Sequence, residues 1–305
     1  MITIKKILCP VDFHPASQSA LKYATALAAG HHAKLKLLHV VPPIISNAYS
    51  YLRDVVSTSG SMKEEFERRL EKITAKVKAE GIAVENEVTL GHVAPEIERV
   101  IREYKPDLVT MGTHGRRGLE RWFMGSTTER LLRHSPVPLL TIADATKLRG
   151  DGSRFKRILV TTDFSDGTAD ALDYAFAVGR ENDAQITLLH VVQLPSAFLV
   201  EDGAFLAQKA EKEDALSKLV PAKVRRAHRV DTRVAKGTPH QVILNILKRE
   251  KIDLLVMNIH GKGILERALF GSTAERVVRA ARCPVMMIPP MAKTASKAPA
   301  RKQAA

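Results

Sequence analysis

Residues 111–142 read MGTHGRRGLERWFMGSTTERLLRHSPVPLLTI, and residues 257–288 read MNIHGKGILERALFGSTAERVVRAARCPVMMI. Fourteen of these 32 aligned positions are identical without a gap, at a spacing of 146 residues. The pentapeptide LLHVV at 37–41 also returns at 188–192. These identities show that the chain contains two copies of one sequence unit. The spacing is far longer than that of a solenoid repeat, so each copy is a domain of its own.

The length of 305 residues agrees with this duplication, since a domain typically takes about 150 residues. We expect the first domain at residues 1–143 and the second at 155–290. The stretch 144–154 is rich in Gly, Asp and Ser, which predicts a linker. Residues 291–305 are mostly Ala, Lys and Pro without periodicity, which predicts a disordered basic tail.

Short apolar runs alternate with helical patterns through the first copy. We expect strands at 4–11, 35–41, 82–88, 108–111 and 137–142, helices at 15–29, 63–80, 95–104 and 127–134, and loops at 44–61 and 112–125. The second copy repeats this, with strands near 156–161, 186–192, 229–234, 253–258 and 285–288. Alternation of this kind predicts the α/β class, with a mostly parallel, doubly wound sheet covered by helices on both faces.

The composition narrows the class of protein. The formal net charge is +14, and seven of these charges lie within 144–157 and 291–305, so the folded copies carry only half. We therefore do not expect a nucleic acid partner. The two cysteines give no disulfide framework. No apolar run approaches a membrane span, so we expect a soluble cytoplasmic protein without a membrane partner.

Two sequence features follow predicted strands, where doubly wound sheets bind their ligands. One is Asp12, and the other is the glycine-rich loop after Met111. The loop leads through Gly125, Ser126 and Thr127 into a helix. Free backbone N–H groups and the positive end of the helix dipole make such a helix start an anion site, so phosphate binding is one interpretation.

A purely structural interpretation stands beside it. Ser126 with Glu129, and Ser272 with Glu275, fit a capping box, in which serine and glutamate satisfy the free donors of a helix start. The two roles are compatible, so the pattern leaves both open.

Other chemistry is not indicated by the sequence. It contains no GxxxxGK[ST], GxGxxG, GxSxG or HExxH motif, which argues against a fast ATPase or kinase and against a metal held by protein side chains. We expect the histidines at equivalent positions of the two copies to be hydrogen-bonding or packing residues: His39, His190, His114 and His260.

The spacing G-x2-G-x9-G-[ST] resembles that of nucleotide-binding members of the universal stress protein family. Gly112, Gly115, Gly125 and Ser126 match it in full. The segments PVDF, LLHVV and PVPLLTI are similar to that family as well, and both copies share the resemblance. It implies two tandem domains of the adenine nucleotide alpha hydrolase-like fold, each with a five-stranded parallel sheet in the order 3-2-1-4-5 flanked by helices.

The resemblance also implies a ligand, ATP, with Mg or Mn on its phosphates, and a set of contacts. In the first copy these are Pro10, Asp12 and Val40 at the adenine, Met111 and Gly112 beside the ribose, and Gly115, Gly125, Ser126 and Thr127 at the phosphates. In the second copy they are Asp163, Val191, Met257, Gly261, Gly271, Ser272 and Thr273. Asn258 replaces the first glycine there. Its bulk leads us to expect weaker binding by the second copy.

The favoured hypothesis is an ATP-binding stress-response or signalling module. The alternatives are a slow ATPase or nucleotide-transfer enzyme, and a non-catalytic interaction protein with a basic surface. The closing strands 137–142 and 285–288 would be apolar sheet edges, which need a partner. The resemblance implies that they pair as an intramolecular pseudo-dimer, and it leaves a further homodimer open.

Overall fold

The computed structural model describes residues 2–43, 52–113, 124–143, 155–193, 202–220, 222–227, 229–259 and 271–290, with the backbone alone at 52–61, 181, 202–204, 223, 226 and 227. Two predicted ligand contacts, Gly115 and Gly261, lie outside the described residues, as do His114 and His260.

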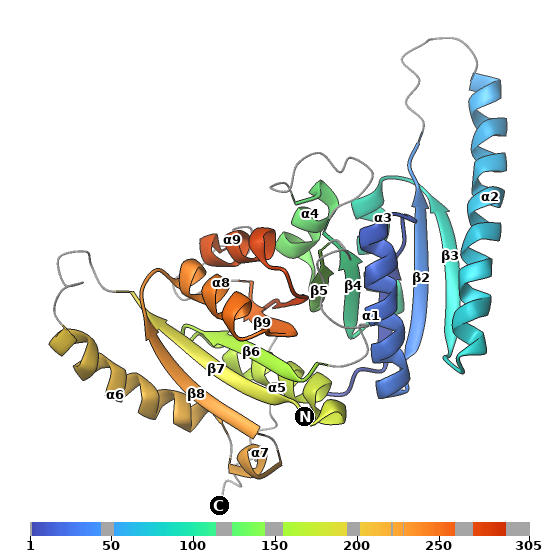
Figure 1. Ribbon diagram of the computed structural model, residues 1–305. Coiled ribbons are helices and arrows are strands. Elements are labelled where there is room, and N and C mark those ends of the chain that lie inside the picture. Colours follow the sequence, from blue (N-terminus) through green and yellow to red (C-terminus); the bar gives the residue numbers. More distant parts are fainter. Residues whose placement is uncertain are drawn as a thin grey trace, which may run out of the picture.

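The described residues of each copy follow the predicted alternation of strands and helices (Figure 1). Domain 1 contains β1 (Lys6–Pro10), α1 (Pro15–His31), β2 (Lys34–Val41), α2 (Leu52–Ala79), β3 (Val84–Leu90), α3 (Val93–Tyr104), β4 (Leu108–Gly112), α4 (Ser126–His134) and β5 (Leu139–Ile142). Domain 2 contains β6 (Arg157–Thr162), α5 (Thr168–Gly179), a 3-10 turn (Arg180–Asn182), β7 (Gln185–Val192), α6 (Asp202–Leu219), α7 (Ala222–Ala227), β8 (Arg229–Lys236), α8 (Pro239–Arg249), β9 (Leu254–Asn258), α9 (Ser272–Ala280) and β10 (Val285–Ile288).

The strands form one ten-stranded sheet in the order β3-β2-β1-β4-β5-β10-β9-β6-β7-β8. Within each domain this is the order 3-2-1-4-5, and the paired strands there are parallel. The two five-stranded sheets are joined by the antiparallel pairing of β5 with β10, which places Leu140 opposite Met286. The Thr141 hydroxyl adds a hydrogen bond of 3.0 Å to the Val285 carbonyl. The two domains therefore share one sheet.

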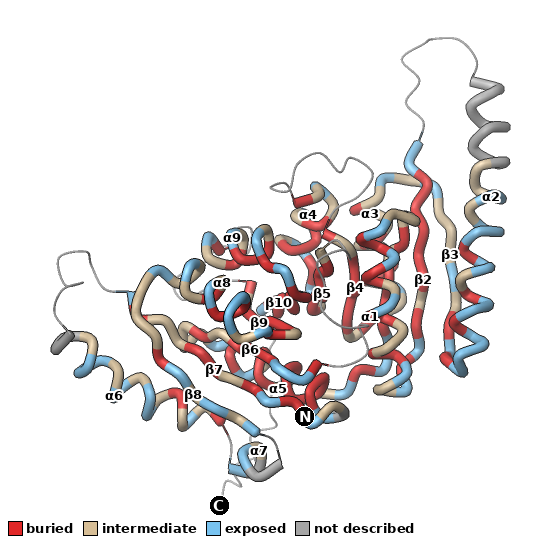
Figure 2. The backbone as a smooth tube through the Cα atoms, in the orientation of Figure 1, coloured by how far each residue is buried: buried red, intermediate tan, exposed pale blue. Residues whose placement is uncertain are grey.

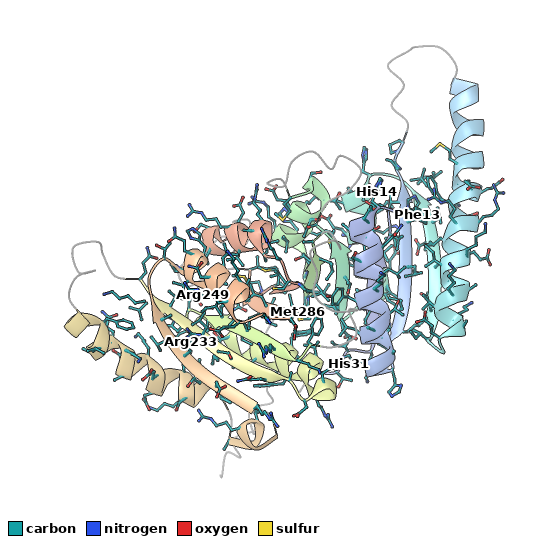
Figure 3. The ribbon with its side chains drawn as sticks, in the orientation of Figure 1. Phe13, His14, His31, Arg233, Arg249 and Met286 are labelled. Atoms are coloured by element: carbon teal, nitrogen blue, oxygen red, sulfur yellow. The ribbon has the colours of Figure 1, made fainter. Side chains whose placement is uncertain are left out.

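Helices cover both faces of this sheet, and each face has a core to which both domains contribute. On one face α1, α2, α5 and α6 cover a core that includes Leu70, Leu140 and Met286. On the other face α3, α4, α8 and α9 cover a core that includes Ile97 and Ile243. The central strands are almost wholly buried (Figure 2), and Met286 lies at the junction of the two halves (Figure 3).

The predicted loop over residues 44–61 is wrong in its second part, because α2 begins at Leu52. The run STSGS at 57–61 is typical of a turn, but here it continues a helix. Adding a turn to an existing helix costs far less than starting one, so the strongly helical residues that follow extend across it. The ends of the other predicted strands and helices differ from the structure by no more than two residues.

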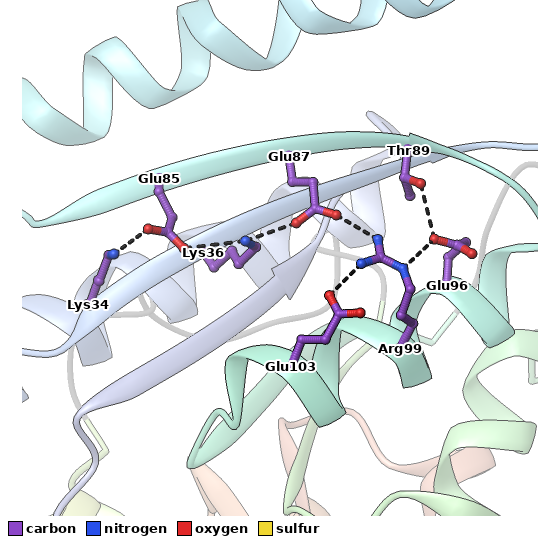
Figure 4. A network of polar contacts seen from close by, with 8 residues as sticks. All are labelled: Lys34, Lys36, Glu85, Glu87, Thr89, Glu96, Arg99 and Glu103. Carbon is purple, nitrogen blue, oxygen red and sulfur yellow. Dashed lines mark hydrogen bonds and ion pairs between the residues drawn. The ribbon is translucent and has the colours of Figure 1, made fainter.

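An ionic network covers the edge of the sheet at β2, β3 and α3 (Figure 4). The Arg99 guanidinium is its centre and donates hydrogen bonds to Glu87 (2.6 Å), Glu96 (2.9 Å) and Glu103 (2.5 Å). Partial burial acts to raise the pKa of Glu87, but the contacts of Lys36 and Arg99 outweigh it and lower that pKa. For Glu96, the hydrogen bond from Arg99 is the main cause of its lowered pKa.

Replacing Arg99 by glutamine is expected to lower the free energy of unfolding by about 1 kcal/mol near neutral pH. The lowered pKa values mean that the carboxylates stabilise the fold above their ordinary pKa of 4.5 and lose this effect as the pH falls below it. Urea unfolding from neutral pH down to about pH 3 should therefore show a shallower acid loss in the variant. Arg68→Gln, which breaks an exposed pair with Glu65, is the control. An unchanged pH dependence in Arg99→Gln would contradict the prediction.

Candidate functional site

A cavity of about 200 Å³ lies at the C-terminal ends of the domain 2 strands. It is bordered by the ends of β6, β7 and β9 and by the first turns of α8 and α9. The structure brings together here all the described residues that the sequence predicted as ligand contacts in the second copy: Asp163, Val191, Met257, Gly271, Ser272 and Thr273.

The wall of this cavity combines apolar side chains with a few polar groups. Leu189, Pro239 and Ile243 extend the apolar part beyond the predicted Val191 and Met257. No sequence pattern indicated these three residues. Pro239 and Ile243 belong to α8. The spacing of apolar residues in a helix shows which of its faces is buried, but not where that helix packs on the sheet. An apolar wall with a few convergent polar groups is typical of small-molecule sites.

The carboxylate of Asp163 is held by a tight turn after β6. Its Oδ1 accepts a hydrogen bond of 3.0 Å from the Ser165 backbone N–H, and Phe164 between them has a left-handed φ of 63°. Domain 1 repeats this turn, because Asp12 Oδ1 accepts a bond of 3.0 Å from His14 N–H and Phe13 has a φ of 65°. Asparagine, aspartate and glycine are the usual residues of left-handed backbone, so a phenylalanine there in both domains marks a closely specified turn.

The first backbone N–H groups of α4 and α9 have no acceptor within their own helices. The N-cap residues are Gly125 and Gly271, and among the described residues no side chain caps either helix. The capping-box interpretation of Ser126 and Ser272 is therefore wrong, since these serines stand one residue too late. Glu129, which that interpretation needed, instead contacts Arg133 at 2.8 Å. The first N–H groups of both helices remain available to an anion.

Gly125 and Gly271 do not need to be glycine for conformational reasons. Their φ angles are both −60°, with ψ at 139° and 133°, a region open to every residue. A glycine without a conformational role leaves space where a side chain would stand. At Gly271 that space belongs to the cavity.

The described predicted residues of domain 1 lie at or near the corresponding strand ends and helix start. Thr128 Oγ1 donates to the Gly112 carbonyl at 3.1 Å, and Gly125 N–H donates to the Thr113 carbonyl at 2.9 Å, so the end of β4 is tied to the start of α4. The Asp12 N–H donates to Ser17 Oγ at 3.3 Å. Pro10 ends β1, and Val40 and Met111 are buried near the ends of their strands.

His39 and His190 have packing and hydrogen-bonding roles, as predicted. The rings of His39 and His190 lie 4.8 and 4.5 Å from Phe13 and Phe164, and their Nδ1 atoms lie 2.6 and 2.8 Å from carbonyl oxygens. Burial lowers the pKa of His190, which favours the neutral ring. Cys9 and Cys283 are buried, and burial raises each thiol pKa to about 12.

The described part of the chain holds no group of three or more His, Cys, Asp or Glu side chains able to bind a metal ion. None of its helices combines the length and the apolar character that crossing a membrane requires.

The sequence was compared with protein families and with known proteins. Residues 3–143 and 154–289 each match the model of the universal stress protein family. Universal stress protein MJ0531 of Methanocaldococcus jannaschii is 32% identical over 146 residues, which are 46% of this chain and 86% of that protein. A universal stress protein of Mycolicibacterium smegmatis is 26% identical and spans 93% of this chain and 97% of its own length.

A crystal structure gives the same architecture across both domains. It is that of a universal stress protein from Archaeoglobus fulgidus, with a TM-score of 0.69 and 23% sequence identity. The match covers 93% of this chain and 96% of that one, so the tandem arrangement is shared along with the fold of each domain.

Proposed function

The chain belongs to the universal stress protein family, and from this premise we propose that it binds adenine nucleotides, ATP first among them, as a stress-response or signalling module. The observation that carries the proposal is the domain 2 cavity. It joins a carboxylate, an apolar wall and the donor end of a helix at the C-terminal edge of a doubly wound sheet.

The residues around the cavity fit such a ligand in chemical terms. The apolar side chains of Val191, Ile243 and Met257 suit the faces of a purine, and Asp163 offers an acceptor to its amino group. The N–H groups of Ser272 and Thr273 suit phosphate oxygens. A volume of about 200 Å³ is below the ~300–1,000 Å³ of sites for drug-sized ligands, so the enclosed part matches a nucleoside, with the phosphates towards α9.

In domain 1 we assign the same roles to the equivalent residues. Pro10, Asp12 and Val40 would contact the base, Met111 and Gly112 the ribose, and Gly125, Ser126 and Thr127 the phosphates, with Gly115 and Gly261 completing the two sets. A Mg or Mn ion would reach the site on the phosphate oxygens and would neutralise part of their charge.

The two domains, residues 1–143 and 155–290, would act as the halves of an intramolecular pseudo-dimer joined at β5 and β10. We propose binding rather than fast turnover. Among the described residues that line the cavity, Asp163 supplies the carboxylate, and its Oδ1 already accepts a hydrogen bond from the Ser165 N–H. The cytoplasm, where ATP is abundant, is the proposed location.

Adding Mg-ATP to the full chain is expected to raise its melting temperature. A ligand at a hundred times its dissociation constant stabilises the folded state by about 2.7 kcal/mol. That is a shift of roughly 4 °C per occupied site for a chain of this size. Asp12→Asn together with Asp163→Asn should remove most of the shift, while Asp214→Asn on the exposed part of α6 should retain it. The absence of any shift in the unaltered chain would contradict the proposed function.

A further inference from the structure

Position 112 in domain 1 has room only for glycine, because the start of α1 packs directly against it. A Cβ at Gly112 would lie 2.8 Å from the Ala16 carbonyl carbon and 2.9 Å from the Ser17 nitrogen. These are backbone atoms, which cannot move without displacing the helix. Glycine at the end of β4 therefore lets α1 pack closely, and Figure 3 shows that Phe13 and His14 lie at this end of α1.

In domain 2 the small residue of this contact lies before the helix, and the larger residue lies at the end of the strand. Asn258 stands in place of Gly112, and Gly167 stands in place of Ala16. A Cβ at Gly167 would lie 3.0 Å from Asn258 Oδ1 and 3.1 Å from its Cγ and Nδ2. The asparagine amide thus fills the space that the missing side chain of Gly167 leaves. It is turned towards the start of α5, although the residue borders the cavity.

A third position has changed with these two. Ser165 stands in place of His14, and Asn258 Nδ2 donates a hydrogen bond of 3.3 Å to its Oγ. The Ser165 N–H in turn donates to Asp163 Oδ1 at 3.0 Å. A continuous chain of contacts therefore runs from the end of β9, through the turn, to the carboxylate at the cavity. Gly112 has no side chain with which to make this link in domain 1.

We propose that Asn258 is a positioning residue of the domain 2 site, which holds the Ser165 turn and through it the Asp163 carboxylate at the cavity. This inference rests on the proposed nucleotide binding. It also changes the expectation that domain 2 binds more weakly, because that expectation assumed that the asparagine occupies ligand space. Its amide instead lies against Gly167 and Ser165, so domain 2 has a competent site of its own.

The test is a double-variant cycle read by calorimetric titration of Mg-ATP into the full chain. All proteins carry Gly125→Val, so that the heat reports on domain 2. Asn258→Ala should weaken binding about tenfold, because the Asp163 turn loses its anchor. Added to Asp163→Asn, it should cost less than about twofold more, since it acts through that carboxylate. Ser165→Ala should reproduce the loss, and Asn245→Ala on the exposed side of α8 should not.

The possible outcomes separate this inference from the proposed function. No binding by the unaltered chain would contradict both. Binding by the unaltered chain but none by the Gly125→Val chain would contradict the inference alone. Unchanged or tighter affinity when Asn258→Ala is added to Gly125→Val would contradict it as well, because the asparagine would then be neutral or obstructive. Fully additive losses with Asp163→Asn would contradict it too. Melting temperatures of all variants, measured without ligand, show whether each one is folded.

Discussion

Replacing Gly271 by valine is expected to weaken ATP binding by domain 2 about a hundredfold, which is a loss of ~2.7 kcal/mol. Gly271 is the N-cap of α9 and borders the cavity, so a branched side chain there would compete with the phosphates for space and for the first helical N–H groups. Its φ of −60° and ψ of 133° accept valine without strain. The fold should therefore survive a change that removes the ligand.

The measurement is a titration of Mg-ATP followed by calorimetry, with the melting temperature of the free protein as the check on folding. Losing the glycine cap should cost about 1 kcal/mol, or roughly 2 °C. Ala280→Val is the matched control, because it places the same side chain at the exposed far end of α9. Full affinity in Gly271→Val would show that phosphates do not approach this helix start.

Replacing Met286 by alanine is expected to lower the free energy of unfolding by about 2–5 kcal/mol. Met286 is fully buried in β10, opposite Leu140 of β5, and belongs to a core that contains residues of both domains. The cavity left by the shortened side chain would lie at the junction, so the effect should cross from domain 2 into domain 1.

Hydrogen exchange measured by mass spectrometry would follow the two halves separately. Backbone amides of β5 and of β10 should lose protection together in the variant. Leu206→Ala is the control, since that side chain is 59% exposed and its loss should change little. Loss of protection confined to domain 2 would mean that the shared sheet does not couple the stability of the two domains.

Much of the fold was predictable from local pattern. The repeated LLHVV strand, the alternation with helices and the repeat itself determine two doubly wound domains. The joining of β5 to β10 is different. The apolar residues of Leu139–Ile142 indicate that this edge needs a partner, but only the resemblance indicated which strand that partner is. The start of α2 at Leu52 was not predicted, because the residues STSGS at 57–61 are typical of a turn but become helical when a strong helix follows them.

The site was predictable residue by residue only where a loop follows a strand. Asp163, Gly271 and Ser272 lie in such loops or helix starts and meet at one cavity. Ile243 depends on how α8 lies across the sheet, which its own apolar pattern does not state. The role of Asn258 depends on a second position, Gly167, ninety-one residues away in the chain. Asn258 viewed alone looks like the loss of a glycine. Gly167 shows that the small and the large residue of the contact have exchanged places between strand and helix start.

Native mass spectrometry of the full chain after incubation with Mg-ATP tests the central claim most directly. Two adenine nucleotides should be bound per chain, one in Gly271→Val or Gly125→Val, and none when both glycines are replaced. Dialysed chain without added nucleotide gives the reference mass. Folded, unaltered chain that retains no nucleotide at any concentration of Mg-ATP would contradict the account.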